Sequence, residues 1–169
     1  TNAKKGATVQ GVNLELNASP SNRMQVQSGF TFQKSFFEEA QEFGEKRFFR
    51  SPDNYGYFSL NYSPSMKLSL SGTGNYTGSM LVPYFGPAIE NPAAGALRTS
   101  NPFFDAGFKA AYTMKLNNYL KLEWNAGIKN IFNSYQADFD IGINRDPSYI
   151  YGPVSPRTIY LGIRIGSLL

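Results

Sequence analysis

The sequence predicts an all-β protein of antiparallel strands, and three observations carry this prediction. Apolar residues recur at every second position along several segments, which is the period of a strand with two different faces. Two of these segments reach roughly nine to eleven residues or more, the length that crosses a bilayer at a tilt, whereas soluble strands usually stop near five or six. The connections between the segments alternate strictly between short and long. Together these observations favour an up-and-down transmembrane β-barrel.

The clearest pair of strands covers residues 104–116 and 120–128. Every even position from 104 to 116 is apolar, and the alternation restarts after Asn117-Asn118. Two turn residues between two alternating runs predict a β-hairpin. A soluble β-sandwich shows the same alternation on one face, so this hairpin alone leaves both environments open.

Five further segments show the same alternation, near residues 9–18, 24–33, 55–62, 66–75 and 158–166. Short turns are expected at 19–22, 63–65 and 117–118. The connections at about 36–53, 81–102 and 132–156 have no period of two and predict long loops, with room for a short helix in the first. Short turns on one side and long loops on the other are the layout of bacterial outer-membrane barrels.

The amino-acid composition limits the classes of function that the protein can have. The 169 residues include no Cys and no His, which excludes disulfide frameworks, thiol catalysis, imidazole metal sites and Ser-His catalysis. We therefore expect neither an enzyme nor a bound cofactor. Sixteen Lys and Arg against twelve Asp and Glu give a mild net charge of +4, which does not favour nucleic-acid binding. Fourteen Phe and eleven Tyr suit the aromatic girdles of an outer-membrane barrel or cross-strand pairs in a soluble sheet.

The face opposite the apolar residues is polar, which suits a wet or plugged lumen. Six charged side chains are expected to face this lumen: Asp105, Lys109, Lys121, Glu123, Lys129 and Arg164. Pairing across strands is the simpler role for them, and contact with a plug is the alternative. The strand count is seven, whereas single-chain bacterial barrels have an even number. This predicts either the C-terminal portion of a larger barrel or a small eight-stranded barrel with one strand missed. The absence of a secretory leader at Thr1 likewise predicts a removed leader or a piece of something longer.

Three segments resemble TonB-dependent outer-membrane receptors. Residues 127–133, Gly-Ile-Lys-Asn-Ile-Phe-Asn, resemble the motif that ends the penultimate barrel strand of that family. Residues 151–153 and 156–164 resemble its final loop and closing strand, and residues 11–16 resemble an earlier strand. The segment 130–157 is most similar to receptors of Bacteroidetes-type bacteria. The terminal Leu168-Leu169 departs from the family, which usually ends on an aromatic residue.

The resemblance implies a 22-stranded barrel in the outer membrane of a Gram-negative bacterium, with an N-terminal plug in its lumen. Residues 1–169 would supply its last seven strands, without the plug. The implied function is active import of a scarce nutrient, which is cobalamin, haem, an iron chelate or a glycan. The implied partners are TonB, engaged through the missing N-terminal part, the plug domain, outer-membrane lipid, a small-molecule or metal-chelate substrate and a surface lipoprotein. The rival functions are a small eight-stranded barrel acting as an anchor or adhesin, and a soluble β-sandwich or ligand-binding barrel.

The long loops hold the candidate substrate-binding residues, a mixture of aromatic and charged side chains that stacks on a planar ligand and hydrogen-bonds its polar edge. They are Tyr84, Phe85, Tyr135, Phe139, Arg145, Asp146, Tyr149 and Tyr151. Packing of the loop over the barrel mouth is the alternative role for Tyr149 and Tyr151, and anchoring at the membrane interface is the alternative role for Tyr84 and Phe85.

Two groups of charged loop residues have a simpler interpretation. Asp138, Asp140 and Asp146 offer carboxylates for Ca²⁺ but lack the spacing of a calcium loop, so we expect solvated charges there and no metal site. The charged residues of the first loop suggest contacts with lipid headgroups or a partner, but solvated charge is the default. These are Glu38, Glu39, Glu45, Lys46, Arg47 and Arg50.

Overall fold

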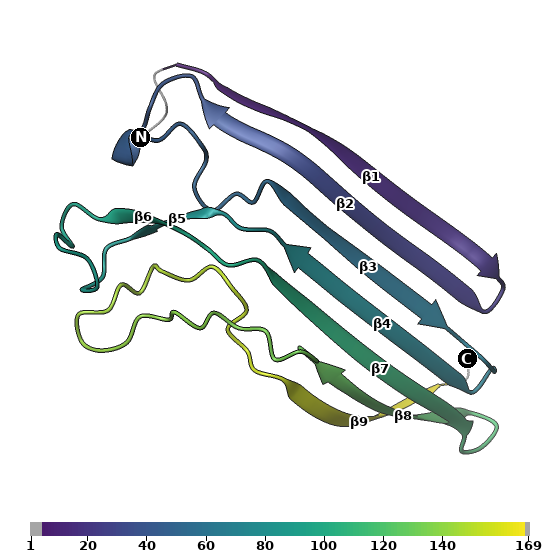
Figure 1. Cartoon of the computed structure of the whole chain (residues 1–169). Helices are drawn as coiled ribbons and strands as arrows, with labels where there is room; N and C mark the ends of the chain where they lie inside the picture. The colour runs from purple at the N-terminus through teal and green to yellow at the C-terminus, as the bar shows by residue number, and fades with distance from the viewer. Residues whose placement is uncertain (1–4, 168–169) are drawn as a thin grey trace.

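The structure is a computed structural model that describes residues 5–167, and strands dominate it (Figure 1). Seven long strands form one sheet, β1 (Ala7–Ser21), β2 (Met24–Phe37), β3 (Asn54–Tyr62), β4 (Leu68–Thr77), β7 (Phe103–Lys115), β8 (Leu120–Lys129) and β9 (Thr158–Ser167). A second, two-stranded sheet pairs β5 (Leu81–Tyr84) with β6 (Ala96–Thr99). The described helical structure is a single 3-10 turn, η1 (Glu42–Gly44). Between residues 5 and 167, no helix is long and apolar enough to span a membrane.

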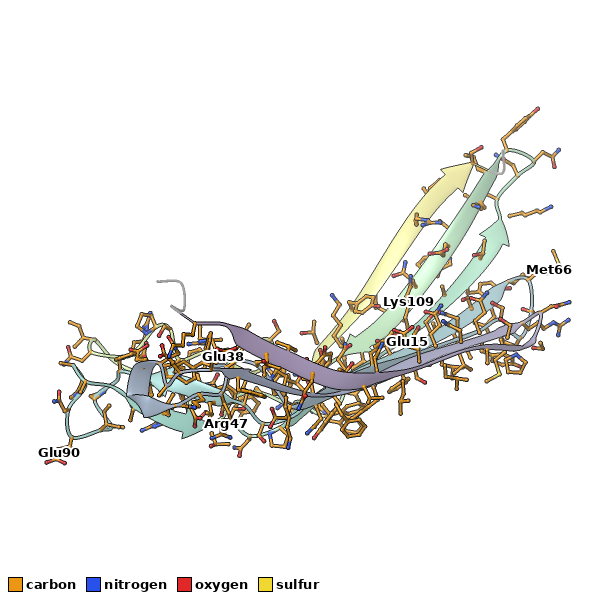
Figure 2. The ribbon with its side chains drawn as sticks, turned by 90° about the horizontal axis from the view of Figure 1, so that it is seen from above. Glu15, Glu38, Arg47, Met66, Glu90 and Lys109 are labelled. Atoms are coloured by element: carbon orange, nitrogen blue, oxygen red, sulfur yellow. The ribbon has the colours of Figure 1, made fainter. Side chains whose placement is uncertain are left out.

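The seven-stranded sheet is an antiparallel meander in the order β1-β2-β3-β4-β7-β8-β9. Each strand pairs with its neighbours in sequence, and the β5–β6 hairpin is inserted between β4 and β7. The predicted all-β antiparallel class and its seven long strands are confirmed. Figure 1 shows the sheet open, with the short turns at one end and the long connections at the other. Figure 2 labels Met66 in a short turn and Glu90 in a long connection at these opposite ends.

The register places the apolar side chains of neighbouring strands on one face. Trp124 on β8 lies opposite Tyr112 on β7 and Ile163 on β9. The face stays exposed across the sheet, with 49% of Trp124 and 59% of Ile163 accessible. A soluble sandwich would bury these side chains against a second layer. The face therefore has the character of a surface that meets an apolar solvent.

The other face carries the charged residues predicted to line the lumen. Glu123 lies opposite Arg164, and the carboxylate and guanidinium form an ion pair at 3.9 Å. In Figure 2 the strands β7–β9 bend toward this side of the sheet, and Glu15 and Lys109 lie on the inside of the bend. We call this surface the inner face and the apolar surface the outer face.

Aromatic rings cover glycines of the neighbouring strands on both faces. On the outer face, the rings of Phe58 and Phe104 occupy the space that a Cβ at Gly74 would need, and the two rings stack at 6.2 Å between centroids. On the inner face, the ring of Tyr160 lies over Gly127 in the same way. A glycine beside a ring lets the ring lie flat against the backbone, so these pairs hold the register of adjacent strands.

All three predicted short turns have other bounds in the structure. The turn predicted at 117–118 spans residues 116–119, because β7 ends at Lys115 and β8 begins at Leu120. The first strand continues through Pro20 to Ser21, and its turn is at 22–23 rather than 19–22, because a register shift between Ala18 and Ser21 accommodates the proline. The turn predicted at 63–65 extends to residue 67, so the following strand begins at Leu68 and Met66 is fully exposed. The hydroxyl oxygen of Ser65 accepts hydrogen bonds from the N–H groups of residues 67 and 68, which stabilises this longer turn.

The loop predicted over 81–102 is wrong in part, because it contains the β5–β6 hairpin. The prolines at 83, 87 and 92 favoured an irregular segment. Pro83 is nevertheless accommodated within β5, at an edge of a two-stranded sheet, where a missing N–H is tolerated. The expectations about Thr1 and about Leu168-Leu169 lie outside the described residues.

Candidate functional site

Three long connections leave the same end of the sheet and pack together into what we call the loop layer, residues 38–53, 78–102 and 130–157. Its dry centre consists of Val82, Tyr84 and Tyr149, which are 0–1% exposed. The rings of Tyr84 and Tyr149 meet edge to face, with 4.8 Å between centroids. Among the described residues these are the largest fully buried side chains, so the tightest packing lies in the loops and not in the sheet.

A stacked arginine closes this centre on one side. The guanidinium carbon of Arg98, on β6, lies 3.6 Å from the centroid of the Tyr84 ring and 5.5 Å from that of Tyr149. The Tyr84 hydroxyl in turn accepts a hydrogen bond from the Ala88 N–H at 3.2 Å. Arg98 is half-buried, and a cation–π contact contributes about 0.5–1 kcal/mol at an exposed site and about 2 kcal/mol where it is fully desolvated. Arg98 therefore joins the β5–β6 hairpin to the last connection.

Asp138 receives two tyrosine hydroxyls. Its carboxylate accepts hydrogen bonds from Tyr149 at 2.7 Å and from Tyr151 at 2.6 Å. Burial acts to raise the pKa of Asp138, but the hydroxyl bonds from Tyr151 and Tyr149 outweigh it and the pKa is lowered. Burial and the same carboxylate raise the pKa of Tyr149 to about 12 and also raise that of Tyr151. At neutral pH the site thus holds one carboxylate and two protonated phenols.

Asp146 is almost buried, which overturns the expectation that it is a solvated charge. One carboxylate oxygen accepts bonds from the Ser148 hydroxyl and N–H, and the other accepts the Phe85 N–H at 2.8 Å. Burial opposes ionisation, but these donors outweigh it and the pKa of Asp146 is lowered. The Asp140 carboxylate is engaged separately, with the Asp146 N–H at 2.7 Å. Within residues 5–167, no three acidic side chains converge in a way that could hold a metal ion.

Arg50 ties the three connections together, although a solvated charge was expected there. Its guanidinium donates to the carbonyl oxygens of Ser148 at 2.6 Å and Ile150 at 2.8 Å. Its backbone N–H donates to the Leu81 carbonyl at 2.7 Å. The backbone of Arg50 has a φ of 56°, in the left-handed region, which aims its N–H and side chain at different loops.

The asparagines of the 127–133 motif shape the start of the last connection. Asn130 and Asn133 have φ values of 49° and 53°, a conformation that asparagine adopts more readily than most residues. The Asn130 amide donates to the carbonyls of Ser134 and Ser155 and accepts the Ser134 N–H. It therefore holds the two ends of the connection together, close to the point where β9 begins.

The predicted binding residues fall into two groups. Tyr84, Tyr149 and Asp146 are buried and serve the loop core, together with Tyr151. The other four, Phe85, Tyr135, Phe139 and Arg145, are exposed.

Two grooves flank Phe139 at the surface. One, of about 630 Å³, is lined by Tyr135, Phe139, Ile141 and Val154. The other, of about 410 Å³, is lined by Phe139, Ile141, Arg145 and Ile150. Both volumes lie in the range of small-molecule sites. Phe85 lies apart from both grooves, and its ring instead faces that of Phe43 at 6.0 Å.

Sequence reasoning missed three residues of the site: Arg98, Gln136 and the clamping role of Arg50. The buried Gln136 amide donates to the Tyr149 carbonyl and accepts the Tyr151 N–H. The only signal for such a residue was its position beside Tyr135 in an aromatic segment. Arg98 carried no signal at all, because its partners Tyr84 and Tyr149 lie far from each other in the sequence.

Comparison with family models and with curated proteins finds no match. Several solved structures are similar. The ferric-catecholate import receptor Fiu from E. coli K12, in its open form, is 22% identical with a TM-score of 0.61, over 93% of this chain and 20% of the receptor. The ferripyoverdine receptor of the outer membrane of Pseudomonas aeruginosa, bound to ferripyoverdine, is 16% identical with a TM-score of 0.67, over 96% and 20%. The receptor in the FpvAI–pyocin S2 complex is 17% identical with a TM-score of 0.66, and the match covers 96% of this chain and 19% of that receptor.

These neighbours are TonB-dependent outer-membrane receptors of Gram-negative bacteria, and they are transport receptors rather than enzymes. The chain spans about a fifth of their length. At this level of identity the likeness shows the fold alone, so the resemblance found in the sequence is confirmed as a fold: residues 5–167 have the fold of one part of such a β-barrel.

Proposed function

We propose that residues 1–169 are the C-terminal portion of the β-barrel of a TonB-dependent outer-membrane receptor that imports a scarce nutrient. The observation that carries this proposal is the exposed apolar outer face, which crosses all seven strands between an end of short turns and an end of long loops. In water such a face would be a large aggregation surface. In a bilayer it meets hydrocarbon, while the polar inner face meets a lumen.

Among the predicted nutrients, an iron chelate is the one that the comparisons favour, ahead of cobalamin, haem and a glycan. Fiu imports ferric catecholates and the Pseudomonas receptor was solved with ferripyoverdine. The exposed residues beside the two grooves suit such a cargo, because Tyr135 and Phe139 offer aromatic faces and Arg145 offers a cation to an anionic chelate. The partners that complete the proposal are TonB, a plug domain, outer-membrane lipid and a surface lipoprotein.

The location is tested by fractionating cells that make the protein in its natural length. We expect it in the outer membrane, with a folded form that migrates differently from the boiled form in gel electrophoresis. A monodisperse protein in detergent-free buffer would instead support a soluble β-protein and reject the proposal.

The transport role is tested by growth of a deletion strain on one limiting source at a time: cobalamin, haem, a ferric siderophore or an oligosaccharide. We expect loss of growth on the ferric siderophore, restored by the wild-type gene. Arg145→Ala and Phe139→Ala should weaken the restoration, whereas Arg47→Ala, outside both grooves, should not. Unchanged growth on every source, with a correctly located barrel, would favour the anchor or adhesin.

A further inference from the structure

The last connection, residues 130–157, leaves several apolar side chains exposed at the loop end of the sheet. Ile141, Ile143 and Val154 are 85%, 99% and 66% exposed. The dry centre of the loop layer does not include them, so packing within the loops does not account for them. Two of the three, Ile141 and Val154, line a groove. Exposed apolar side chains around a hollow indicate a binding surface rather than a structural core.

The two grooves beside Phe139 adjoin, because Phe139 and Ile141 line both of them. The larger groove, of about 630 Å³, extends over Val154. Its two amide side chains, Asn133 and Gln136, already accept backbone N–H groups of the loop. A ligand in this groove would therefore meet mainly aliphatic and aromatic surface, which suits a hydrocarbon chain.

The smaller groove adds a single available charge. Within residues 5–167, the Arg145 guanidinium forms no ion pair and no hydrogen bond. The two carboxylates of the same groove, Asp140 and Asp146, each accept a backbone N–H of the loop layer. Arg145 is therefore the charged group with which a bound anion can pair.

We propose that the cargo is an amphiphilic iron chelate, whose anionic head pairs with Arg145 and whose hydrocarbon chain lies in the larger groove over Ile141 and Val154. This inference rests on the proposed function and narrows its class of substrate. The cation and the apolar groove lie on either side of Phe139, so one ligand with a charged end and an apolar end satisfies both.

Three other occupants fit the two grooves less well. A compact polar chelate pairs with Arg145 but leaves the larger groove without contacts. An apolar protein segment fills that groove but covers Arg145 without a counter-charge, which is unfavourable. A bilayer lipid lies at the level of the strands, whereas this connection lies beyond the ends of β8 and β9, each of ten residues and long enough to cross the hydrocarbon.

The test measures binding to isolated outer membranes that contain the protein at its natural length, with binding to membranes of the deletion strain subtracted. The probes are two anionic ferric complexes, one with a catecholate head and one with a carboxylated hydroxamate head. Each is made with a dodecanoyl chain and, as its match, with an acetyl group at the same position. We expect the dodecanoyl form of a bound head to bind at least about tenfold more tightly than its acetyl match, since burial of about two methylene groups suffices for that gain.

Variants of the last connection assign the gain to the groove. Ile141→Asn combined with Val154→Asn should remove the preference for the dodecanoyl form. Ile143→Asn should keep it and is the matched control, because it changes a comparably exposed isoleucine of the same loop that lines neither groove. Arg145→Gln should weaken the binding of both forms by the same factor, because the two forms share the head.

Equal binding of the dodecanoyl and acetyl forms by the wild-type protein would overturn the inference and leave the proposed function standing. The same preference in the double variant and in Ile143→Asn would also overturn it, because the chain would then lie elsewhere. Absence of binding of all four complexes, with the barrel in the outer membrane, would instead reject the iron-chelate cargo of the proposed function.

A second measurement asks whether the groove is open before the chelate binds. A small water-soluble thiol reagent is added to outer membranes that contain Val154→Cys or the control Ile143→Cys, and labelling at each position is quantified by mass spectrometry. Both thiols should react without chelate, and the dodecanoyl complex should slow labelling in Val154→Cys alone. Slow labelling in Val154→Cys before any chelate is added would show that lipid or another part of the barrel fills the groove, which overturns the inference.

Discussion

The sheet and the loop layer bury their apolar residues in opposite ways. The sheet spreads Leu, Ile, Phe and Trp over an exposed outer face, and Ala106 is the one buried hydrophobic residue that its described strands hold. The loop layer, which would be the most mobile part of many proteins, encloses Val82, Tyr84 and Tyr149 in a dry centre. The contrast indicates that the two regions meet different surroundings: the sheet is stabilised by an external apolar phase and by backbone pairing, and the loops by their own packing.

Removing the central tyrosine should break the loop layer and leave the sheet intact. We expect Tyr149→Ala to cost about 3–5 kcal/mol of local stability, because it empties the space beside Tyr84 and removes a hydrogen bond to Asp138. Limited proteolysis should then cut within 130–157 while the barrel keeps its heat-modifiable form. Tyr135→Ala, at an exposed position of the same connection, should stay within about 0.5 kcal/mol of wild type. Equal proteolysis of both variants would contradict the assigned core.

A charge on the outer face tests the sheet in the same way. We expect Trp124→Arg to cost about 2–4 kcal/mol for folding in a bilayer, since the guanidinium would enter hydrocarbon at mid-strand. The neighbouring Asn125→Arg places the same charge on the inner face and should be much milder. Reversible folding into lipid vesicles at increasing urea measures both. Equal losses would show that the two faces have been exchanged or that neither meets lipid.

Alkaline pH should weaken the loop layer before the sheet. The pKa of Tyr149 is raised from 10.0 to about 12 by burial and by Asp138, so its contribution is complete below pH 10 and is lost as the pH rises through 12. A pKa difference of one between the folded and unfolded states corresponds to about 1.4 kcal/mol, which makes the loss at most about 3 kcal/mol. Phenolate absorbance measures the ionisation of Tyr149, and proteolysis within 130–157 measures the accompanying loss of loop stability. In Asp138→Asn the titration should move to lower pH, because the carboxylate that opposes the phenolate charge is gone.

The arginine clamp offers a smaller test of how the loops are held. Arg50→Ala removes two charged hydrogen bonds to the carbonyls of Ser148 and Ile150, and we expect a loss of about 1–2 kcal/mol in the local stability of the last connection. Arg50→Lys should recover only part of it, since an ammonium lacks the planar two-pronged geometry. Hydrogen exchange of the N–H groups in 146–151 measures the change. Arg145→Ala, whose side chain lies at a groove, is the control.

The smallest expected effect lies on the outer face of β4. A Cβ at Gly72 meets nothing within 4 Å, so Gly72→Ala should stabilise the barrel by about 0.5–1 kcal/mol through a stiffer strand. Gly74→Ala, two residues along on the same face, should destabilise it because the added methyl overlaps the rings of Phe58 and Phe104. The two variants are compared by the urea concentration at which each is half unfolded in lipid vesicles. Matching shifts in the two variants would contradict the ring-over-glycine packing.

Prediction from the sequence was most successful where the determining contacts are local. Alternation along 104–116 assigned Lys109 to one face and Phe108 to the other, and the register agrees. It was least successful where a residue depends on a distant partner. The sequence predicted that Pro20 lies in a turn. In the structure a register shift beside Pro20 lets the strand continue to Ser21.

In the candidate site, too, the sequence predicted local features but not contacts between distant segments. Tyr149 and Tyr151 could be picked out as aromatic residues in a long loop, with packing already weighed as their role. That Tyr149 packs on Tyr84 and hydrogen-bonds Asp138 required the loops to be docked. The ligand-binding role of the exposed Tyr135, Phe139 and Arg145 stays a prediction.

The sequence by itself determined the antiparallel strands, their two unlike faces and the alternation of short and long connections, because a period of two and the chemistry of turns act within a few residues of the chain. Only the tertiary structure decided which loop residues are buried and that Arg50 and Arg98 join separate connections. Those properties arise from contacts between segments far apart in sequence, and no local pattern encodes which segments meet.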